Sequence, residues 1–379
     1  MPTGKIPALL LVTLLTISGC VTLKENTLPA TQYSSYDFPA YSVKPPSDPR
    51  WRFWYKNKEE QSVSFINSDT NAYFSLWIIP LFKDSSIQGR EKNIIEHYQN
   101  KTLKEYKLSP DIKLSEQSFQ KKEERIGNKA YNILTISYEL KNEPYEFSIY
   151  YYVPPQNDIL YNFSIFKNKK KFRDAASEEN LKNDFSTMLK DIKFREPKKE
   201  DMITLRVNYA FANFSESAQD KYLKEKLGEL KEKYNLALDE VNNWLRLKEN
   251  NYKAYRLLGV LNSYNDKFER YGEGLDLKEA IANFNTSIQI RKYYKAAHLN
   301  LAELYEAIGQ ADNAINEYQF IIGISPNDEN VYYKLGKLYE AKNDKKTAKF
   351  YYEKAIRCWG SGFNTLSELK NKIKGWTKS

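Results

Sequence analysis

The chain has 379 residues, of which 41% are apolar and 28% are charged, and this is enough for two or three domains with real cores. Its formal net charge is +9, but acidic and basic residues are interleaved throughout, without the basic block that nucleic-acid binding needs, so we expect no nucleic-acid partner. The two cysteines and two histidines are scattered, which argues against a zinc site, and we expect neither a metal nor a cofactor.

The amino terminus has the pattern of a secretory signal. Lys5 precedes an apolar stretch at residues 6–17, which is too short to span a bilayer because a spanning helix needs about 20 residues. The stretch ends in the sequence ISGC at Cys20, which resembles the lipobox of bacterial lipoproteins. The resemblance implies that residues 1–19 are removed, that the Cys20 thiol receives a diacylglyceryl group, and that the new amino terminus is acylated.

A lipidated Cys20 would anchor the chain to a membrane without spanning it, because several acyl chains together bind a bilayer stably. Val21, rather than an aspartate, follows the cysteine, and the resemblance then implies the outer membrane, facing the periplasm, in a cell with two membranes. Residues 20–50 contain five prolines and are predicted to be the lipidated cysteine and an extended tether. With Cys20 modified, Cys358 is left without a disulfide partner.

Residues 51–195 are predicted to form an α+β domain. Apolar and polar residues alternate in several segments, as in strands, and two stretches with apolar residues at helical spacing interrupt them. The clearest strands are 72–78, 134–140, 147–153 and 159–165, and the helical stretches are 94–106 and 181–192. This order predicts an antiparallel sheet flanked by helices. The order of elements resembles the PsbP/Mog1-like sandwich, whose members are mostly binding or accessory modules.

A linker is predicted at residues 196–217, and the sequence after it is helical with an internal repeat. Six positions recur after 34 residues with the same or a similar residue type. They are Leu301, Ala302, Tyr305, Ala314, Tyr318 and Ile321, which recur as Leu335, Gly336, Tyr339, Ala348, Tyr352 and Ala355. This period and pattern resemble the tetratricopeptide repeat, in which pairs of helices stack into a solenoid. Gly336 and Ala302 are then the small residues that let the paired helices approach closely.

The resemblance covers residues 218–376 of a repeat domain predicted at 218–379. An earlier, irregular copy opens at Tyr255, and its second helix starts nine residues late, so Asp266–Asp276 or its neighbours are predicted to form an inserted loop. Residues 237–244 look like the second helix of a still earlier copy. Residues 365–376 look like a capping helix, which a repeat stack needs to cover its last apolar face.

Stacked repeats of this kind form a concave groove lined by their first helices. By resemblance to the family, the groove-facing positions are Lys253, Arg256, Asn300, Glu303, Asn330, Tyr333, Lys334 and Lys337. Some members hold a terminal carboxylate with such residues, and Arg256, Asn300 and Lys334 match that clamp, whereas Val260 and Asn330 depart from it. The alternative is a generic polar groove. Either form favours an acidic or carboxylate-bearing segment of a protein partner.

The sequence contains none of the phosphate-binding, dinucleotide-binding, serine-hydrolase or zinc-protease motifs, so we expect no enzyme. The leading hypothesis is a non-catalytic, membrane-anchored scaffold or assembly factor of the bacterial cell envelope. A second hypothesis is that the α+β domain captures a small molecule in an apolar pocket lined by residues such as Trp77, Tyr151 and Phe163. A third is an envelope enzyme whose site no motif reveals.

Overall fold

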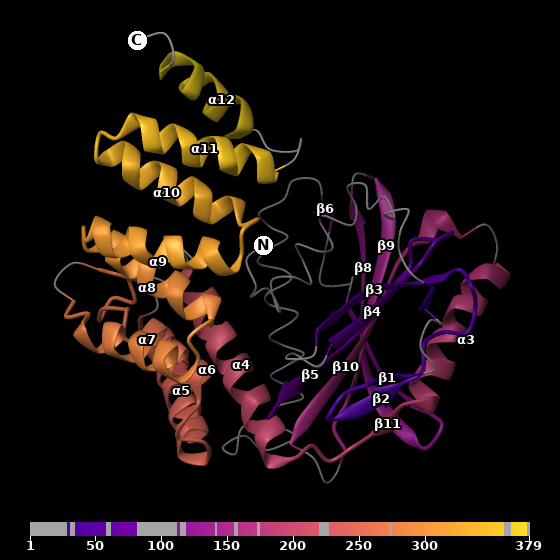
Figure 1. Ribbon diagram of the computed structural model, residues 1–379. Coiled ribbons are helices and arrows are strands. Elements are labelled where there is room, and N and C mark those ends of the chain that lie inside the picture. The colour runs from indigo at the N-terminus through magenta and orange to yellow at the C-terminus, as the bar shows by residue number, and fades with distance from the viewer. Residues whose placement is uncertain are drawn as a thin grey trace. The chain divides into compact units, whose positions relative to one another are not determined.

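The computed structural model contains two compact units, Met1–Ala212 and Asn213–Ser379 (Figure 1). The residues that the structure describes are 29–30, 35–57, 62–81, 112–113, 119–140, 142–154, 158–172, 175–219, 227–272, 275–359 and 365–376. The signal segment, Cys20 and the predicted helix at 94–106 lie outside them. Among the described residues, no helix is both long enough and apolar enough to cross a membrane.

The first unit is built on an antiparallel sheet of eight strands in the order β3-β4-β5-β10-β9-β8-β6, with β7 also paired to β8. The strands are β3 (Trp51–Asn57), β4 (Ser62–Asn67), β5 (Tyr73–Pro80), β6 (Ile112–Lys113), β7 (Phe119–Ile126), β8 (Lys129–Leu140), β9 (Glu143–Tyr152) and β10 (Ile159–Asn168). The four strands predicted most clearly are β5, β8, β9 and β10. The predicted antiparallel sheet is confirmed, and of the two predicted flanking helices the structure describes the second, α3 (Ala175–Asp191).

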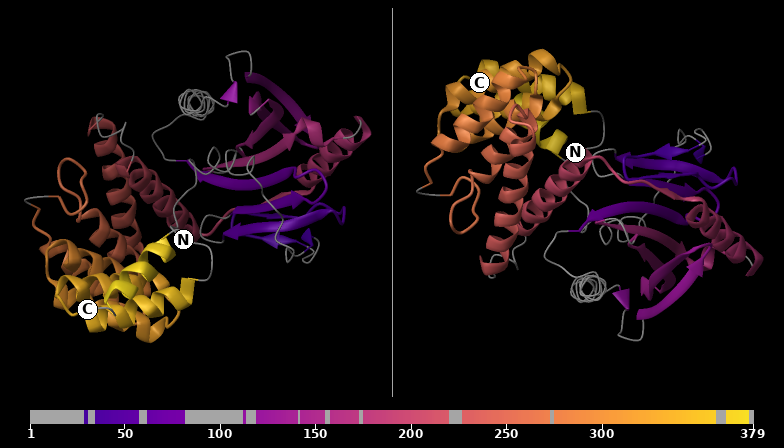
Figure 2. Two further views of the ribbon diagram at one scale, coloured as in Figure 1. Left: turned by 90° about the horizontal axis from the view of Figure 1, so that it is seen from above. Right: turned by 90° about the horizontal axis from the view of Figure 1, so that it is seen from below.

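Both faces of the sheet are buried. The central strands have apolar residues at successive positions, and successive side chains point to opposite faces of the sheet. Helix α3 lies along one face of the sheet (Figure 2). Phe74 and Phe163 pack with this helix, and the Phe74 ring lies 4.8 Å from the ring of Phe185. A short 3₁₀ turn, η3 (Lys169–Lys171), leads from β10 towards this helix. Side chains such as Phe147 and Tyr151 form a second cluster on the opposite face.

The prediction of an extended tether over residues 20–50 is wrong for the described part of that range. Strands β1 (Tyr36–Asp37) and β2 (Tyr41–Val43) form a second, three-stranded sheet with β11 (Lys193–Phe194). The Tyr161 hydroxyl donates a hydrogen bond of 2.9 Å to the carbonyl of Ala40. The buried aromatic rings in this stretch belong to the main core of the first unit, and they outweigh the prolines that suggested a tether.

The predicted linker at residues 196–217 is also wrong, because helix α4 (Lys199–Gln219) runs through it. Leu205, near its beginning, is buried in the core of the first unit. Phe214, near its end, packs in the second unit with its ring 5.2 Å from that of Tyr234 and 5.0 Å from that of Tyr264. The apolar positions of this segment therefore have buried partners, which a solvent-exposed linker would lack.

The second unit is built from helices, as predicted, and a single isolated β-bridge joins Tyr264 and Arg270 among its described residues. Its helices after α4 are α5 (Leu227–Leu247), α6 (Tyr252–Leu261), α7 (Lys278–Ile290), α8 (Lys295–Ala307), α9 (Ala311–Ile324), α10 (Glu329–Ala341), α11 (Lys345–Trp359) and α12 (Thr365–Trp376). Helices α6 to α12 stack in chain order, and α6/α7, α8/α9 and α10/α11 form successive hairpins (Figure 1). Helix α12 packs on α11 through Leu369 and Ile373, which contact Tyr352 and Ala348.

Close helix approach explains the small residues of the repeat. A Cβ atom added to Gly336 would lie 2.5 Å from the Tyr352 ring, and one added to Gly259 would lie 2.6 Å from the Phe284 ring. Such distances are shorter than any ordinary van der Waals contact, so only glycine fits without displacing the ring. The predicted role of Gly336 in helix approach agrees with this geometry.

Candidate functional site

The predicted groove residues lie on α6, α8 and α10, the first helices of three successive hairpins. Several of them meet across the helices: the Arg256 Nη1 atom donates to Asn300 Oδ1 at 3.2 Å, and Lys334 Nζ lies 3.8 Å from Glu303 Oε1. Lys253 lies in the first turn of α6, where its backbone amide donates to the capping residue Asn251. The other three are on α10: Asn330 is exposed near its start, and Tyr333 and Lys337 line a pocket described below.

A tyrosine, a glutamate and a lysine form the same arrangement in two consecutive hairpins. The Tyr318 hydroxyl donates to Glu306 at 2.9 Å, and Lys334 of the next helix lies 3.3 Å from the same carboxylate and above the Tyr318 ring. One repeat later, the Tyr352 hydroxyl donates to Glu340 at 2.6 Å, and Lys372 lies 2.6 Å from Glu340 and above the Tyr352 ring. Lys372 belongs to α12, so the last helix makes the contact that the first helix of another repeat would make.

These contacts leave the predicted carboxylate clamp only partly available. Lys334 is paired with Glu303 and Glu306, and Arg256 is hydrogen-bonded to Asn300. A partner's carboxylate at Lys334 would therefore compete with two carboxylates of the chain itself. The side chains of Lys334, Glu303 and Glu306 are about one-third exposed, and at such exposure an ion pair contributes about 0–1 kcal/mol.

The residues between α6 and α7 pack against this part of the groove. We call residues 263–272 the insertion segment; a bridge between Tyr264 and Arg270 closes it, and Phe268 lies 5.9 Å from Phe214, ring to ring. Arg270 Nη2 lies 3.9 Å from Glu303 Oε2 on α8. Burial raises the pKa of Tyr271 to about 12, with Arg270 lowering it and Glu303 raising it further. The predicted inserted loop is present, but its contact with the groove residue Glu303 was not predicted.

The insertion segment is strained. Phe268 and Tyr271 have positive φ angles of 56° and 59°, a conformation that costs bulky residues about 1–2 kcal/mol each. The Nε atoms of Arg270 and Arg256 are buried without a hydrogen-bond partner among the described residues. A buried polar atom of this kind costs about 1–3 kcal/mol. Aromatic packing by Phe268 against Phe214 and Tyr234 offsets these terms.

A pocket lies beside the predicted groove positions Tyr333 and Lys337. It has a volume of about 380 Å³ and lies between α10, α11 and α12. Its lining residues are Tyr333, Lys337, Glu340, Ala341, Tyr352, Leu369 and Lys372. The members on α10 are spaced by four, three and one residues, so they form a single stripe of that helix. The pocket therefore brings together the predicted residues Tyr333 and Lys337, and adds residues of α11 and α12 that were not predicted.

One signal in the sequence, the 34-residue period, points to some of the residues that were missed. Glu306 and Glu340 are 34 positions apart, as are Tyr318 and Tyr352, so the tyrosine–glutamate contact has the period of the repeat. Lys372 falls outside that period, and it reaches Glu340 only because α12 folds back onto α11. Arg270 and Tyr271 have no counterpart in the repeat, so no periodicity could have placed them.

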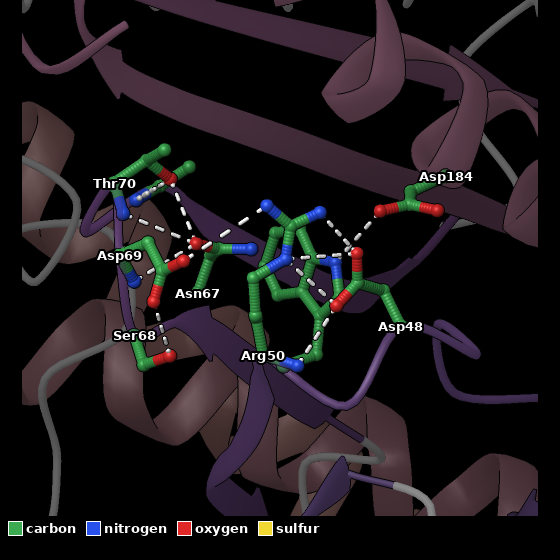
Figure 3. A network of polar contacts seen from close by, with 9 residues as sticks. Asp48, Arg50, Asn67, Ser68, Asp69, Thr70 and Asp184 are labelled. Atoms are coloured by element: carbon green, nitrogen blue, oxygen red, sulfur yellow. Dashed lines mark hydrogen bonds and ion pairs between the residues drawn. The ribbon is translucent and has the colours of Figure 1, made fainter. Parts of the chain in front are cut away.

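The first unit holds a separate polar network around Arg50 (Figure 3). Arg50 Nε donates to both carboxylate oxygens of Asp48 at 2.9 Å, and its Nη1 lies 3.9 Å from Asp69. These hydrogen bonds lower the pKa of Asp48, whereas burial raises the pKa of Asp184, which accepts a hydrogen bond of 2.9 Å from the Trp51 indole. The network joins the start of β3, the β4–β5 turn and α3. Nowhere in the described ranges do histidines, cysteines or carboxylates gather into a group that could hold a metal ion.

The predicted ligand pocket of the first unit is not formed as expected. Trp77 and Tyr151 are both paired in register with Asn162, so these three side chains share one face of the sheet. Phe163 points to the opposite face, where it packs in the main core, so one pocket cannot be lined by all three predicted residues. The carboxamide of Asn162 is completely buried, and neither its nitrogen nor its oxygen has a hydrogen-bond partner among the described residues.

The matches to a known protein family lie in the second unit. Residues 296–328 and 329–357, which span α8/α9 and α10/α11, each match the tetratricopeptide repeat family. No curated protein matches the chain. Similar solved structures include MamA, with a TM-score of 0.30 and 20% identity over 49% of this chain and 95% of that one. A thermophilic TPR protein of Thermus thermophilus has a TM-score of 0.33 and 15% identity over 46% of this chain and 89% of that one.

A third similar structure is SycD, a type III secretion translocator chaperone of Yersinia enterocolitica, with a TM-score of 0.28 and 16% identity over 35% of this chain and 96% of that one. The family matches confirm the repeat that the 34-residue spacing predicted. The chain thus carries tetratricopeptide repeats in its carboxyl-terminal region, behind an antiparallel α+β unit.

Proposed function

We propose that this protein is a non-catalytic scaffold or assembly factor, held at a membrane of the bacterial cell envelope, that binds a segment of a protein partner. The tetratricopeptide repeats support a protein–protein interaction role. The observation that carries the proposal is the pocket beside the groove positions Tyr333 and Lys337, since an open pocket with aromatic and charged walls suits a peptide segment.

The binding role is tested by crosslinking in intact cells. A photoreactive phenylalanine analogue replaces Tyr333 in the pocket, and the matched control carries it at Tyr293, which is 65% exposed and outside the pocket. We expect a discrete protein adduct from position 333 that is absent from position 293. The triple substitution of Tyr333, Lys334 and Lys337 by alanine should abolish capture by a probe placed elsewhere in the groove. Identical adducts at both positions, or none at 333, would contradict the proposal.

The membrane part of the proposal rests on the lipobox sequence that ends at Cys20. Acyl chains on Cys20 would hold the protein at the outer membrane, facing the periplasm, in a cell with two membranes. Mass spectrometry of the protein from cells should find an amino terminus at residue 20 carrying diacylglycerol and an amide-linked acyl chain. A Cys20→Ser variant should lose the label from fed palmitate and leave the membrane fraction. Retention of label by that variant would contradict lipidation at this residue.

A second candidate function, capture of a small molecule by the first unit, is favoured by Asn162. Its buried carboxamide lacks partners among the described residues, and Trp77 and Tyr151 flank it. Native mass spectrometry of the protein and of an Asn162→Leu variant tests this function. A bound molecule lost only in the variant would support it. If Asn162 has only a packing role, no molecule is found and leucine raises stability, because the unpaired polar group is gone. The likeness of this unit to the PsbP/Mog1-like sandwich stays a prediction.

A further inference from the structure

The two repeats differ in which part of the groove is still available. In the α8/α9 repeat, the groove position Glu303 is approached by Lys334 at 3.8 Å and by Arg270 of the insertion segment at 3.9 Å. The chain thus places two cations of its own against that carboxylate. This part of the groove is therefore occupied by the protein itself.

The equivalent position of the next repeat carries the opposite charge. Lys337 stands 34 residues after Glu303, so it occupies the same place on α10 that Glu303 occupies on α8. Lys337 is exposed on the wall of the pocket, and it forms no hydrogen bond or ion pair with any residue that the structure describes. In the α8/α9 repeat, Glu303 is paired with cations of the chain itself. In the α10/α11 repeat, Lys337 has no such ion pair among the described residues and can pair with a carboxylate of another molecule.

The remaining charges of the pocket are balanced. Glu340 accepts hydrogen bonds from Tyr352 at 2.6 Å and from Lys372 at 2.7 Å. Burial acts to raise the pKa of Glu340, but these hydrogen bonds outweigh it and lower the pKa overall, so the carboxylate is ionised and paired with Lys372. Lys337 attracts the Glu340 carboxylate electrostatically but forms no hydrogen bond or ion pair with it, so Lys337 is the cation of this pocket that can pair directly with an incoming carboxylate.

The surrounding helices reinforce this charge. Residues 329–376, which span α10 to α12, contain 11 Lys and Arg against 5 Asp and Glu. Residues 227–328, which span α5 to α9, contain 12 against 15. The basic excess of the repeat region is thus concentrated around the open pocket, where it attracts negatively charged segments from a distance.

The apolar part of the lining specifies the second element of a ligand. The rings of Tyr333 and Tyr352 lie 5.8 Å apart, and Leu369 and Ala341 complete the apolar surface. A volume of about 380 Å³ is at the lower end of the usual range for ligand pockets, about 300–1,000 Å³, so it suits one or two side chains rather than a folded surface. Aromatic and large aliphatic side chains gain most from such a surface.

We propose that the pocket between α10, α11 and α12 binds an acidic segment of a protein partner. An aromatic or large aliphatic side chain of that segment lies against Tyr333 and Ala341, beside the buried Tyr352 and Leu369. A nearby carboxylate of the segment pairs with Lys337. This inference rests on the proposed binding function and adds the location and the chemistry of the bound segment. It also moves the acidic preference from the clamp residues Arg256 and Lys334 to Lys337.

Short synthetic peptides labelled with a fluorophore test this proposal by anisotropy against the full chain. The first peptide has one phenylalanine flanked by aspartates and glutamates, and a second has asparagines and glutamines in their place. A third keeps the acids and replaces phenylalanine by serine. We expect the first to bind at least about tenfold more tightly than the other two, since each lacks one of the two elements.

Charge reversal on the protein completes the test. Lys337→Glu should weaken binding of the first peptide by about tenfold or more, because it replaces attraction by repulsion at the pocket wall. The matched control is Lys370→Glu, which makes the same charge change at an exposed position of α12 that does not line the pocket. It should change the affinity by less than about twofold. Unfolding curves of both variants should match that of the parent protein.

Two results would overturn the proposal: equal affinity for the acidic and the neutral peptide, or equal loss of affinity in Lys337→Glu and Lys370→Glu. The first removes the charge preference, and the second reduces it to a general effect of net charge. Failure of this proposal is distinguishable from failure of the binding function. If Tyr333 still yields a partner adduct in cells while acidic peptides fail to bind, the scaffold role stands and only the chemistry assigned here is wrong.

Discussion

The α8/α9 and α10/α11 hairpins have the same packing and different groove surfaces. Both have a tyrosine on the second helix that donates to a glutamate on the first, with a lysine from the following helix on the same carboxylate. Yet the groove position one turn before that glutamate is Glu303 in one and Lys337 in the other. Packing residues must repeat because the helices stack in one way. Groove residues are free of that constraint, so they can carry specificity.

Removing the tyrosine ring that both repeats share should have the largest effect on stability. Tyr352→Ala should lower the free energy of unfolding of the repeat region by about 3–5 kcal/mol, because a fully buried aromatic side chain leaves a cavity under α12. Urea denaturation followed by far-ultraviolet circular dichroism measures this. Tyr318→Ala should cost a similar amount, whereas Tyr352→Phe should lose only the hydrogen bond to Glu340, about 1–2 kcal/mol. A loss in Tyr352→Phe as large as in the alanine variant would show that the hydroxyl, and not the ring, dominates.

The position at which paired helices approach closely is Gly336 in the α10/α11 hairpin and Ala302 in the α8/α9 hairpin. Gly336→Ala should destabilise the protein by about 1–3 kcal/mol, because the new methyl group would lie 2.5 Å from the Tyr352 ring. Thermal denaturation compares it with Gly323→Ala on α9, where a Cβ would meet no atom within 4 Å. That control should be stabilising by up to about 1 kcal/mol, as alanine is the better helix former. A neutral Gly336→Ala variant would contradict the close approach.

His298 makes one repeat sensitive to pH, whereas the equivalent position of the next repeat is Tyr332. Its Nδ1 lies 2.6 Å from the Glu317 carboxylate and its Nε2 lies 2.8 Å from the Lys292 carbonyl, so the protonated ring can donate a hydrogen bond to each. Burial acts to lower the pKa of His298, but the bonds to Glu317 and Lys292 outweigh it and raise the pKa above the usual 6.5.

Because the folded-state pKa of His298 is the higher one, its contribution to stability is complete below about pH 6.5 and is lost as the pH rises through the folded value. Melting temperatures measured between about pH 5 and 9 should therefore fall across this window, by an amount that the His298→Tyr variant lacks. That variant places in the first repeat the residue type that the second repeat already has. Identical pH profiles for the two proteins would show that His298 does not contribute.

The smallest expected changes in stability concern two lysines of α10, Lys334 and Lys337. Lys334→Gln should cost at most about 1 kcal/mol, because the ion pairs of Lys334 with Glu303 and Glu306 are partly exposed. Lys337→Gln should leave the unfolding curve unchanged, because Lys337 has no hydrogen bond or ion pair to lose among the described residues. Urea denaturation of both variants measures this difference. A clear destabilisation by Lys337→Gln would assign that lysine a structural role.

Much of the architecture follows from local patterns. Strands β5, β8, β9 and β10 were predictable because apolar residues recur at every second position, which is the period of a strand. Helix α3 was predictable because its apolar residues have helical spacing. The repeat was predictable because Leu335, Gly336 and Tyr352 pack in the same way as their counterparts 34 residues earlier. The errors at residues 35–50 and 196–217 have a common cause: buried aromatic residues in short strands and in α4 have partners far away in the sequence.

Like the fold, the candidate site could be predicted only in part from the sequence. The sequence by itself determined that polar residues stand at regular positions of α6, α8 and α10, and the likeness to the repeat family predicts that these positions face a groove. Only the tertiary structure decided which of them remain available. Arg270 reaches Glu303 through an insertion without periodicity, and α12 folds back to place Lys372 on Glu340 and Leu369 beside Tyr352. These contacts join segments that are not related by the 34-residue repeat. The spacing of residues in the sequence therefore could not predict that their side chains meet.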